Sequence, residues 1–286
     1  MPMNRIDLHI HSTHSDGSYT PREIVRMAEK KGMKAISITD HDTISQIKES
    51  LEAGKKSRLE VISGVEVSAE FTGGTMHILG YFVDPDNNEL YDMLSRFREG
   101  RDERNPKIVE KLNSLGLAIE YEDILREAGG VTVGRPHIAR VLVKKGFVKN
   151  MEEAFGKYLA KGALAYFDRK RFSSAEIISV IKKAGGLAFL AHPKQLRINE
   201  IGRLQTLVEG LASEGLEGIE AFSSCHSKSE IEEYKKIASK YNLLISGGSD
   251  FHGMSKPEIS IGYVGKGIEI DPSIIEEMKK RVSSSC

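Results

Sequence analysis

Short apolar stretches rich in β-branched residues alternate with stretches of helical periodicity near both ends of the chain. Apolar residues at every second position are typical of strands, and apolar residues three or four positions apart are typical of helices. The pattern predicts seven strands, at Ile6–His11, Ala35–Thr39, Val61–Val67, Met76–Phe82, Leu187–Ala191, Gly218–Phe222 and Leu243–Gly247. Strands that alternate with helices build a parallel sheet or barrel, and a count of seven favours an α/β barrel.

The alternation stops near Tyr91 and resumes near Ser173, and the sequence between these points is helical throughout. Helical spacing and Gly-containing turns predict four helices there, at Leu90–Leu115, Tyr121–Ala128, Pro136–Lys145 and Met151–Leu159. We therefore predict two units. One is a barrel formed by residues 1–95 and 172–286, and the other is a small helical domain inserted at residues 96–171 (the insertion).

The charge of the chain is balanced only in total. Its 286 residues include 41 Lys and Arg and 41 Asp and Glu, so the formal net charge is zero. This balance argues against a protein that coats nucleic acid or lies on a membrane surface, because such proteins carry one-sided charge. The insertion has 17 basic and 11 acidic residues, a net charge of +6, which leaves 24 and 30 for the rest, a net charge of −6.

The sequence shows no signal for a membrane or an oxidising compartment. The first residues form no apolar leader, and no stretch approaches the ~20 apolar residues of a membrane span. The two cysteines, Cys225 and Cys286, lie far apart and build neither a disulfide framework nor a CxxC motif. We therefore expect a cytoplasmic protein with no membrane partner.

His9 and His11, in the first predicted strand, form the strongest local chemical signal. Residues two apart in a strand point the same way, so both imidazoles project together while Leu8 and Ile10 pack on the other face. Two imidazoles on one face are suited to share a metal cation. For this motif alone, a pair of histidines on a solvent-exposed strand face without a metal is an equally good interpretation.

Further residues of metal-binding type follow the first predicted strand or lie in or near the other six. They are Asp16, His41, Glu66, His77, His192, Asp250 and His252. The carboxyl ends of strands in a parallel barrel meet at one mouth, so these side chains can join His9 and His11 there. Six histidines and three carboxylates are too many for one ion and suit two or three ions with a bridging carboxylate. As separate polar groups buried without cations, they would cost roughly several kcal/mol.

The order of these motifs resembles the polymerase and histidinol phosphatase (PHP) superfamily. The matching segments are DLHIHS and SDG within residues 7–17, ITDHD at 38–42, GVE at 64–66, MHILGY at 76–81, LAHP at 190–193 and GSDFH at 248–252. The insertion, with Gly134-Arg135-Pro136-His137, is similar to a stand-alone subgroup that includes nucleoside-monophosphate and 3′,5′-bisphosphate phosphatases and a 5′→3′ exoribonuclease. Asp16 stands where other branches carry a histidine, which favours this subgroup.

The resemblance implies a distorted (β/α)7 barrel with a centre of three metal ions. Carried over to this sequence, it implies one ion at His9, His11, Glu66 and Asp250, a second at Glu66, His77 and His192, and a third at Asp16, His41 and His252. A nitrogen and oxygen shell without cysteine suits manganese, zinc or iron. The family implies the same metals, with manganese often preferred. Such a site hydrolyses phosphate esters by attack of a hydroxide that bridges two of the cations.

Two of the three histidines outside the expected metal set, together with one arginine, are candidates for contact with the substrate. Arg135 and His137 lie at a predicted helix start, where anions are favoured, so they are candidates to bind a substrate phosphate; a surface helix cap is the alternative. His226 follows the sixth predicted strand and is a candidate to bind the phosphate or protonate the leaving oxygen, unless it is an ordinary loop residue. His14 is expected to be an ordinary loop residue.

Other polar and aromatic groups have more than one interpretation. Asp40 and Asp42 flank His41 and are expected either to accept hydrogen bonds from imidazoles or to form a turn. Arginines interleaved with acids predict a solvated, salt-bridged helix face, at Arg96, Arg98, Arg101 and Arg104. Aromatic residues near Arg169-Lys170-Arg171 either stack on short single-stranded nucleic acid or pack in the core, namely Tyr158, Tyr166, Phe167 and Phe172.

The sequence therefore predicts a metal-dependent phosphoesterase for a small phosphorylated substrate. The favoured substrates are nucleotides, namely nucleoside monophosphates, 3′,5′-bisphosphates or short 5′-phosphorylated single-stranded RNA, held under the insertion as a lid. One alternative keeps the chemistry and changes the substrate to a cyclic sugar phosphate or histidinol phosphate. A second alternative is a non-catalytic PHP module that binds nucleic acid.

Overall fold

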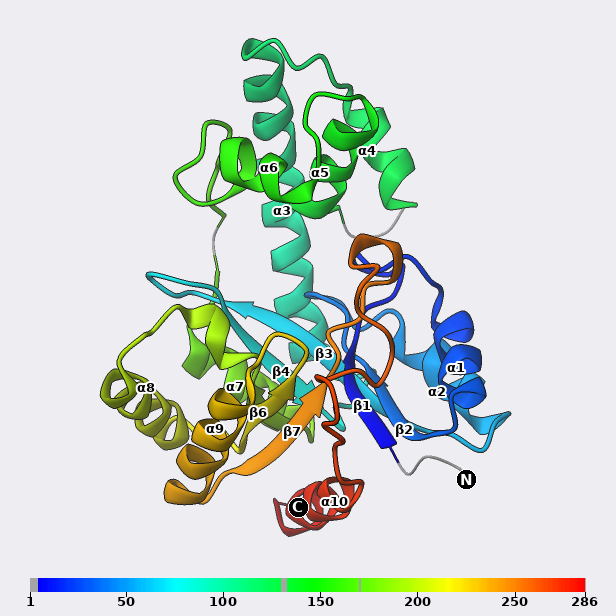
Figure 1. Ribbon diagram of the computed structural model, residues 1–286, viewed down its shortest axis with the longest axis vertical. Coiled ribbons are helices and arrows are strands. Elements are labelled where there is room, and N and C mark those ends of the chain that lie inside the picture. The colour runs from blue at the N-terminus through cyan, green and yellow to red at the C-terminus, as the bar shows by residue number, and fades with distance from the viewer. Residues whose placement is uncertain (1–4, 130–132, 170, 286) are drawn as a thin grey trace.

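The computed structural model describes residues 5–129, 133–169 and 171–285, so Lys170 and Cys286 lie outside the described residues. One sheet holds seven strands in the order of the chain and curls into a nearly closed barrel (Figure 1). The strands are β1 (Arg5–Ile10), β2 (Met33–Ile38), β3 (Glu60–Ala69), β4 (Met76–Tyr81), β5 (Leu187–Leu190), β6 (Gly218–Ser223) and β7 (Leu244–Gly248). All seven lie within two residues of their predicted bounds, which confirms the seven-strand prediction.

The barrel closes between β1 and the residues that follow β7. The Asp250 N–H donates to His9 O at 2.9 Å, and the His11 N–H donates to Phe251 O at 2.9 Å. A Cβ atom on Gly248 would lie 2.3 Å from the Cβ of His9, so only glycine lets β7 approach β1 this closely. The closure thus brings motifs from opposite ends of the sequence side by side.

One strand runs against the others. β4 pairs antiparallel with both β3 and β5, whereas the remaining neighbouring strands pair in parallel. The expectation of an entirely parallel sheet is therefore corrected at β4. Only residues 70–75 separate β3 from β4, which is enough for a hairpin and too short for a helical crossover. The reversal places the start of β4, with His77, at the mouth where the other six strands end.

Helices cover the outside of the barrel, and one helix closes the end opposite the mouth (Figure 1). They are α1 (Pro21–Lys30), α2 (Ile47–Lys55), α7 (Ser174–Lys183), α8 (Ile201–Ser213), α9 (Lys228–Lys240) and the closing helix α10 (Ser273–Ser285). Ile274 and Met278 of α10 belong to the same apolar cluster as Ile6 and Leu187 of the barrel. No described helix combines the length and the apolar character that a membrane crossing requires.

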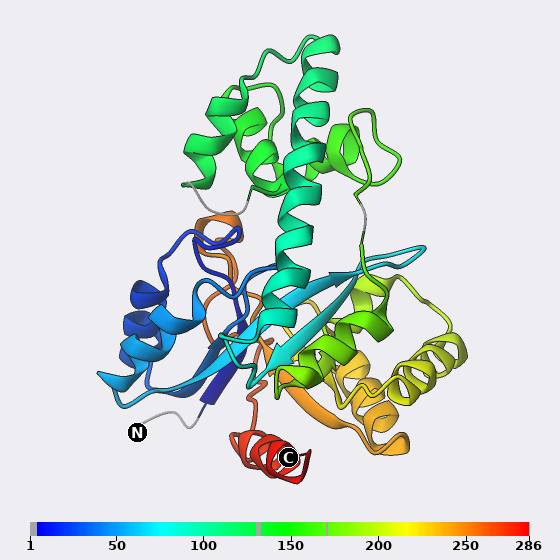
Figure 2. The ribbon, with the colours of Figure 1, turned by 180° about the vertical axis from the view of Figure 1, so that it is seen from behind.

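The insertion rises from the barrel on one long helix, α3 (Asn88–Ser114), as Figures 1 and 2 show from opposite sides. Early in α3, Leu94 and Phe97 pack into the barrel core, and late in α3, Ile108 and Leu112 pack into a separate apolar cluster. The other helices of the insertion are α4 (Tyr121–Ala128), α5 (Arg135–Lys144) and α6 (Met151–Ala154), which continues into a π-helical turn, Phe155–Leu159. One continuous helix therefore contributes to both cores.

Candidate metal centre

The structure brings all nine residues of the predicted metal set together at the barrel mouth. Each belongs to at least one group of side chains whose ligand atoms lie within 4.8 Å of one another. The groups are His11, Asp16, His41 and His252; His9, Glu66 and His192; His9, His11 and Asp250; and His41, Glu66 and His77. Because the groups share members, the arrangement favours a centre of several ions over separate single-ion sites.

His9, His11, Glu66 and Asp250 point their ligand atoms at one another. The Nε2 atoms of His9 and His11 are 3.1 Å apart, and each lies 3.2 Å from Glu66 Oε2. Asp250 Oδ1 lies 3.3 Å from His11 Nε2 and 3.8 Å from His9 Nε2. The alternation of β1 explains the shared direction of the two histidines, and the barrel closure explains why Asp250 lies beside them.

Glu66 turns its other carboxylate oxygen toward His77 and His192. Glu66 Oε1 lies 2.8 Å from His77 Nδ1 and 2.8 Å from His192 Nε2, and those two nitrogens are 3.4 Å apart. The Glu66 side chain is fully buried on β3. Its two oxygens face two different groups of imidazoles, so Glu66 would be a ligand shared by both groups if each held a cation.

Asp16, His41 and His252 gather beside the imidazole of His11. Asp16 Oδ1 lies 3.3 Å from His252 Nε2. The ring centroid of His11 is 4.1 Å from that of His252 and 4.4 Å from that of His41. Asp16 and His252 come from the loops that follow β1 and β7, so this group depends on loop conformation more than the other groups do.

The donor atoms of the centre fit divalent cations. His9 Nδ1 lies 2.8 Å from Glu220 Oε1 and donates to it, so a neutral His9 ring would present its Nε2 lone pair to the place between His11 and Glu66. Among the described residues, no hydrogen bond reaches the buried Glu66 Oε2. Acceptors that converge in a buried place repel one another unless positive charge lies between them. A set of nitrogen and oxygen donors without sulfur suits manganese, zinc or iron.

The pKa of His9 shows the same preference for positive charge. Burial by itself lowers the pKa of this imidazole. The carboxylates of Glu220 and Glu66 outweigh burial and raise the pKa of His9 well above its ordinary value. The centre therefore attracts a proton where no metal is bound, and metal binding has to release that proton.

Three residues of the mouth have left-handed backbone conformations that are unusual for residues with a Cβ atom. The angle φ is 24° at His192, 56° at Asp250 and 53° at Asp42, which follows His41. Such conformations cost about 1–3 kcal/mol each and are typical of functional sites, where the surroundings enforce them. The strain therefore lies where the proposed ligands are held.

Glu220 supports two of the candidate ligands, and the sequence analysis missed it. It is fully buried on β6, its Oε1 accepts from His9 Nδ1, and its Oε2 accepts the backbone N–H of His192 at 2.7 Å. Carboxylates that orient a ligand imidazole in this way are needed for full metal affinity. The available signal was a charged residue within the otherwise apolar segment Gly218–Phe222.

Glu220→Gln is expected to raise the metal dissociation constant about 10–100-fold, because the amide has no charge to fix the His9 tautomer. Titration with metal against a competing chelator measures this constant. Glu217→Gln, just before the same strand, is the matched control and should leave the constant unchanged. Equal metal affinity in Glu220→Gln and the wild-type protein would contradict the assignment.

Asp40 and Asp42 anchor loops and do not accept hydrogen bonds from imidazoles among the described residues. Asp40 accepts the N–H of Ser12 at 2.8 Å and also the hydroxyl groups of Ser12 and Ser15. These bonds fix the loop that leads to Asp16. The turn-forming alternative of the sequence analysis therefore describes Asp40 better than the imidazole alternative does.

Two cavities meet at the candidate metal centre. The larger, of about 510 Å³, lies between the insertion and the β3–β4 hairpin, and the smaller, of about 410 Å³, lies toward the turn after β7. Asp16, His41 and His77 line both cavities. Lys256, which the sequence analysis did not single out, lines the smaller cavity and donates to Asp250 Oδ2 at 2.6 Å. A ligand bound at the centre can therefore extend into either cavity.

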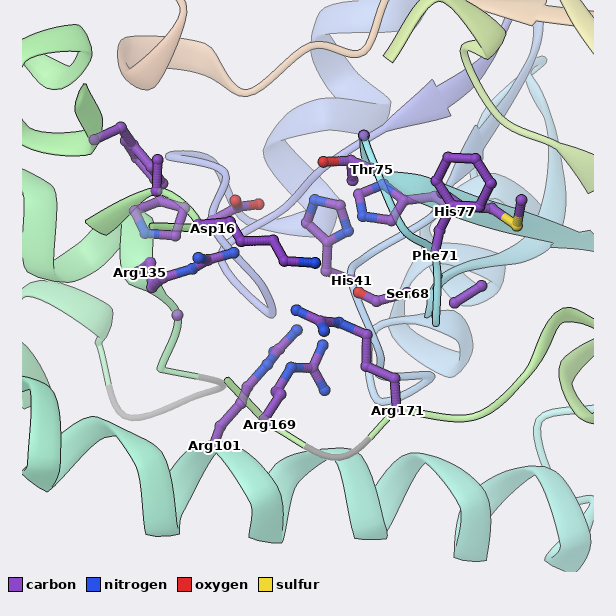
Figure 3. Close-up of a pocket in the computed structure, with 18 of the residues that line it drawn as sticks. Asp16, His41, Ser68, Phe71, Thr75, His77, Arg101, Arg135, Arg169 and Arg171 are labelled. Atoms are coloured by element: carbon purple, nitrogen blue, oxygen red, sulfur yellow. The ribbon is translucent and has the colours of Figure 1, made fainter. Parts of the chain in front are cut away.

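Cationic side chains line the larger cavity (Figure 3). They are Arg101, Arg104, Arg135, Lys161, Arg169, Arg171 and Arg197. In Figure 3 the guanidinium groups of Arg101, Arg169 and Arg171 point from one wall toward His41 and Ser68. The cavity thus combines a candidate metal centre with a strongly cationic wall, which suits an anionic ligand.

The expectation of a solvated arginine face on α3 is wrong for two of its four members. Arg101 and Arg104 are only 8% and 5% exposed, whereas Arg96 and Arg98 are exposed. The spacing explains the difference, because Arg101 and Arg104 follow Phe97 by four and seven positions and continue the buried stripe of the helix. Charged residues in an apolar stripe were the signal that the sequence analysis did not use.

Arg135 and His137 line the larger cavity at the N-terminus of α5. The Arg135 guanidinium lies 5.4 Å from the centroid of the Tyr166 ring. His137 Nδ1 accepts the N–H of Gly134 at 2.9 Å, so His137 is both a helix cap and a cavity residue. Burial lowers the pKa of His137 to about 4, so the ring is neutral at pH 7 and carries its proton on Nε2, where it can donate.

His226 lies outside both cavities. Its Nδ1 donates to Ala221 O at 2.9 Å, and its ring packs edge-on against Tyr234 with centroids 4.8 Å apart. Its role in substrate binding or proton transfer stays a prediction that this geometry does not favour. His14 forms a hydrogen bond with Ser45, consistent with an ordinary loop residue.

Most of the aromatic residues near the return to the barrel serve packing. Tyr158 and Phe167 pack against the core of the insertion, and Phe172 packs against the core of the barrel. Of these four aromatic residues, only Tyr166 lines the larger cavity. The core-packing interpretation therefore holds for three of them.

Known proteins are similar to this chain over nearly its whole length. A family model described as the PHP domain matches residues 7–173. The chain is 32% identical to the 3′,5′-nucleoside bisphosphate phosphatase of Chromobacterium violaceum, with 98% of each chain covered. It is 33% identical to the 5′-3′ exoribonuclease of Haemophilus influenzae, with 96% of this chain and 98% of the relative covered.

Two further similarities concern a diesterase and a solved structure. The chain is 31% identical to the phosphoribosyl 1,2-cyclic phosphate 1,2-diphosphodiesterase of Eggerthella lenta, with 86% of this chain and 94% of the relative covered. The structure is similar to that of a candidate metal-dependent phosphoesterase from Bifidobacterium adolescentis, with a TM-score of 0.86 and 30% identity. That similarity covers 98% of this chain and 97% of the other.

Proposed function

This chain belongs to the PHP domain family of metal-dependent phosphoesterases, and on this premise we propose that it hydrolyses phosphate esters of nucleotides that carry a second phosphate group. Candidate substrates are nucleoside 3′,5′-bisphosphates and short 5′-phosphorylated RNA, with nucleoside monophosphates as weaker substrates. Relatives over most of the chain are named as a phosphatase, an exoribonuclease and a diesterase, so the non-catalytic alternative is set aside.

The choice of substrate rests on one observation, which is that two arginines of the larger cavity have no ion-pair partner among the described residues. Arg104 and Arg135 form no ion pair with a carboxylate of the described residues; Arg104 donates to Asn105, and Arg135 donates to Leu159 O. Burial and the neighbouring arginines, Arg135 first, lower the pKa of Arg104 far below the usual guanidinium value. Cations gathered in this way are stabilised by a bound anion.

The position of these arginines indicates two anion sites. One phosphate would lie at the metal centre, where the expected sets are His9, His11, Glu66 and Asp250; Glu66, His77 and His192; and Asp16, His41 and His252. Bound divalent ions would supply an activated water and a clamp on the phosphate oxygens. The second phosphate would lie against the cationic wall, with His137 Nε2–H as a further donor. The net charge of +6 on the insertion favours the approach of such anions.

A comparison of substrates tests the proposal. We expect kcat/KM for a nucleoside 3′,5′-bisphosphate or a 5′-phosphorylated dinucleotide to exceed that for AMP at least about tenfold, which corresponds to one charge-assisted contact. Phosphate release and chromatography of the products measure these values in the presence of manganese. A highest kcat/KM on histidinol phosphate or a cyclic sugar phosphate would overturn the nucleotide proposal; the diesterase relative makes the cyclic ester the second candidate.

Arg135→Ala is expected to lower kcat/KM for the bisphosphate about 10–100-fold while metal content stays at the wild-type level. The reason is that the proposal places Arg135 against the substrate and not among the metal ligands. His9→Ala, in contrast, should lower both activity and metal content. Arg126→Ala, on the exposed surface of α4, is the matched control. Kinetics of Arg135→Ala equal to those of the control would remove Arg135 from the substrate site.

A further inference from the structure

Arginines of the insertion bind the segments that carry Asp16, His41 and His252. We infer that the insertion assembles the metal position formed by these three residues, with Arg140 as its main positioning residue. The inference rests on the proposed metal centre and goes beyond it, because it makes one metal position depend on a unit that supplies none of the ligands.

Arg140 joins two loops from opposite ends of the chain. It lies on α5, and its Nη1 donates to Asp16 O at 3.2 Å and to Ser255 Oγ at 2.7 Å. The hydroxyl of Ser255 also donates to Asp16 O at 3.3 Å. Glu127 on α4 accepts from Arg140 Nε at 2.9 Å and fixes the direction of the guanidinium. The Arg140 side chain is only 18% exposed, so these contacts are largely shielded from solvent.

Asp42 is the second point of attachment. It follows His41, and its carboxylate pairs with Arg101 of α3 and, at 2.7 Å, with Nη2 of Arg169. These two arginines stand where the chain leaves the barrel and where it returns to it. Asp42 is buried, so these two ion pairs are shielded from solvent. The segment that carries His41 is therefore attached to both ends of the insertion.

Backbone hydrogen bonds of the barrel position most of the other candidate ligands. His9, Glu66 and His77 lie on strands, and the Asp250 N–H donates to His9 O where the barrel closes. Asp16 and His252 lie on loops, and the Arg140 contacts fall on the Asp16 carbonyl and three residues beyond His252. Loss of Arg140 should therefore affect one metal position and leave the rest of the centre intact.

The coupling must act in both directions. If the docked insertion raises the affinity of this position for a metal, the bound metal stabilises the docked insertion by the same free energy. Removal of metal from the wild-type protein with a chelator should therefore increase amide hydrogen exchange in α5. This readout is independent of catalysis.

Metal titration of Arg140→Met tests the inference. The variant keeps the aliphatic stem and removes the donors, so we expect the dissociation constant of one bound metal ion to rise about 10–100-fold, with the constants of the other ions unchanged. Arg140→Lys should restore part of the affinity, and it replaces Arg140→Met if that variant does not fold. Arg126→Met is the control on the neighbouring helix. Metal content by elemental analysis and competition with a chelator give the constants.

The possible results separate this inference from the proposed function. A wild-type protein that binds no metal would refute the proposed metal centre itself. A wild-type protein that binds metal, together with Arg140→Met and Arg140→Lys variants of unchanged affinity, would overturn only the role of Arg140. An equal loss of metal affinity in Arg126→Met would also overturn it, because the effect would then not depend on the contacts of Arg140 with the loops that carry Asp16 and His252.

Discussion

Glu66→Gln is expected to lower kcat/KM by about 10³-fold or more and to reduce metal content, because no other described carboxylate contacts both groups of imidazoles. Glu66 Oε2 faces His9 and His11, and Glu66 Oε1 faces His77 and His192. An amide in its place removes one negative charge and turns an N–H₂ group toward nitrogen lone pairs or cations. Kinetics with saturating manganese, together with elemental analysis, measure both effects.

The control for this substitution is Glu70→Gln, one residue beyond the end of β3 on an exposed side chain. It changes the same functional group just after the same strand, on a side chain that is exposed and belongs to none of the candidate ligand groups, so activity and metal content should remain at wild-type values. A Glu66→Gln protein with full metal content and kcat/KM within about tenfold of wild type would refute a bridging role for Glu66. Its folding should be checked by circular dichroism.

The seven strands and the convergence of the nine candidate ligands could be predicted because both follow from local periodicity. His9 and His11 project together through the two-residue repeat of a strand, and the residues after parallel strands share one mouth. The direction of β4 could not be predicted from that periodicity, because an apolar alternation looks the same in either direction. The short segment between Ala69 and Met76 is the feature that excludes a helical crossover.

The cationic wall shows where sequence reasoning failed and why. Acidic residues between the arginines predict a solvated, salt-bridged face that includes Arg101 and Arg104. Helical spacing predicts the opposite, since the buried stripe of α3 passes through both positions. The charge pattern and the periodicity therefore disagree at these positions, and such disagreement is expected at a site where binding requires groups that destabilise the fold. Glu220, a carboxylate in an apolar strand, is a second case.

The long-range contacts of the site could not be predicted from sequence at all. The attachment of Arg140 to the Asp16 loop and the pairing of Asp42 with Arg169 join residues more than a hundred positions apart. Neither contact produces a periodic pattern of residues from which it could be predicted. They depend on how the insertion docks on the barrel, which is set by the length and direction of α3 (Figure 2).

Arg104→Met is expected to stabilise the protein and to weaken substrate binding at the same time. Arg104 is buried, pairs with no described carboxylate and lies near four other arginines that raise the cost of its charge. Replacing it with an apolar side chain should add about 1–2 kcal/mol to the free energy of unfolding in phosphate-free buffer, measured by urea denaturation. The same substitution should lower kcat/KM for a nucleoside 3′,5′-bisphosphate about 10²-fold and for AMP much less.

Arg96→Met is the control, because Arg96 is exposed on the same helix and lines neither cavity. It should leave both stability and kcat/KM close to wild-type values. Inorganic phosphate provides a third readout, since an anion that binds only the folded state raises its stability. Phosphate should therefore stabilise the wild-type protein and Arg96→Met more than Arg104→Met. If Arg104→Met instead loses stability and keeps its activity on the bisphosphate, Arg104 holds the insertion together and the second phosphate must bind elsewhere.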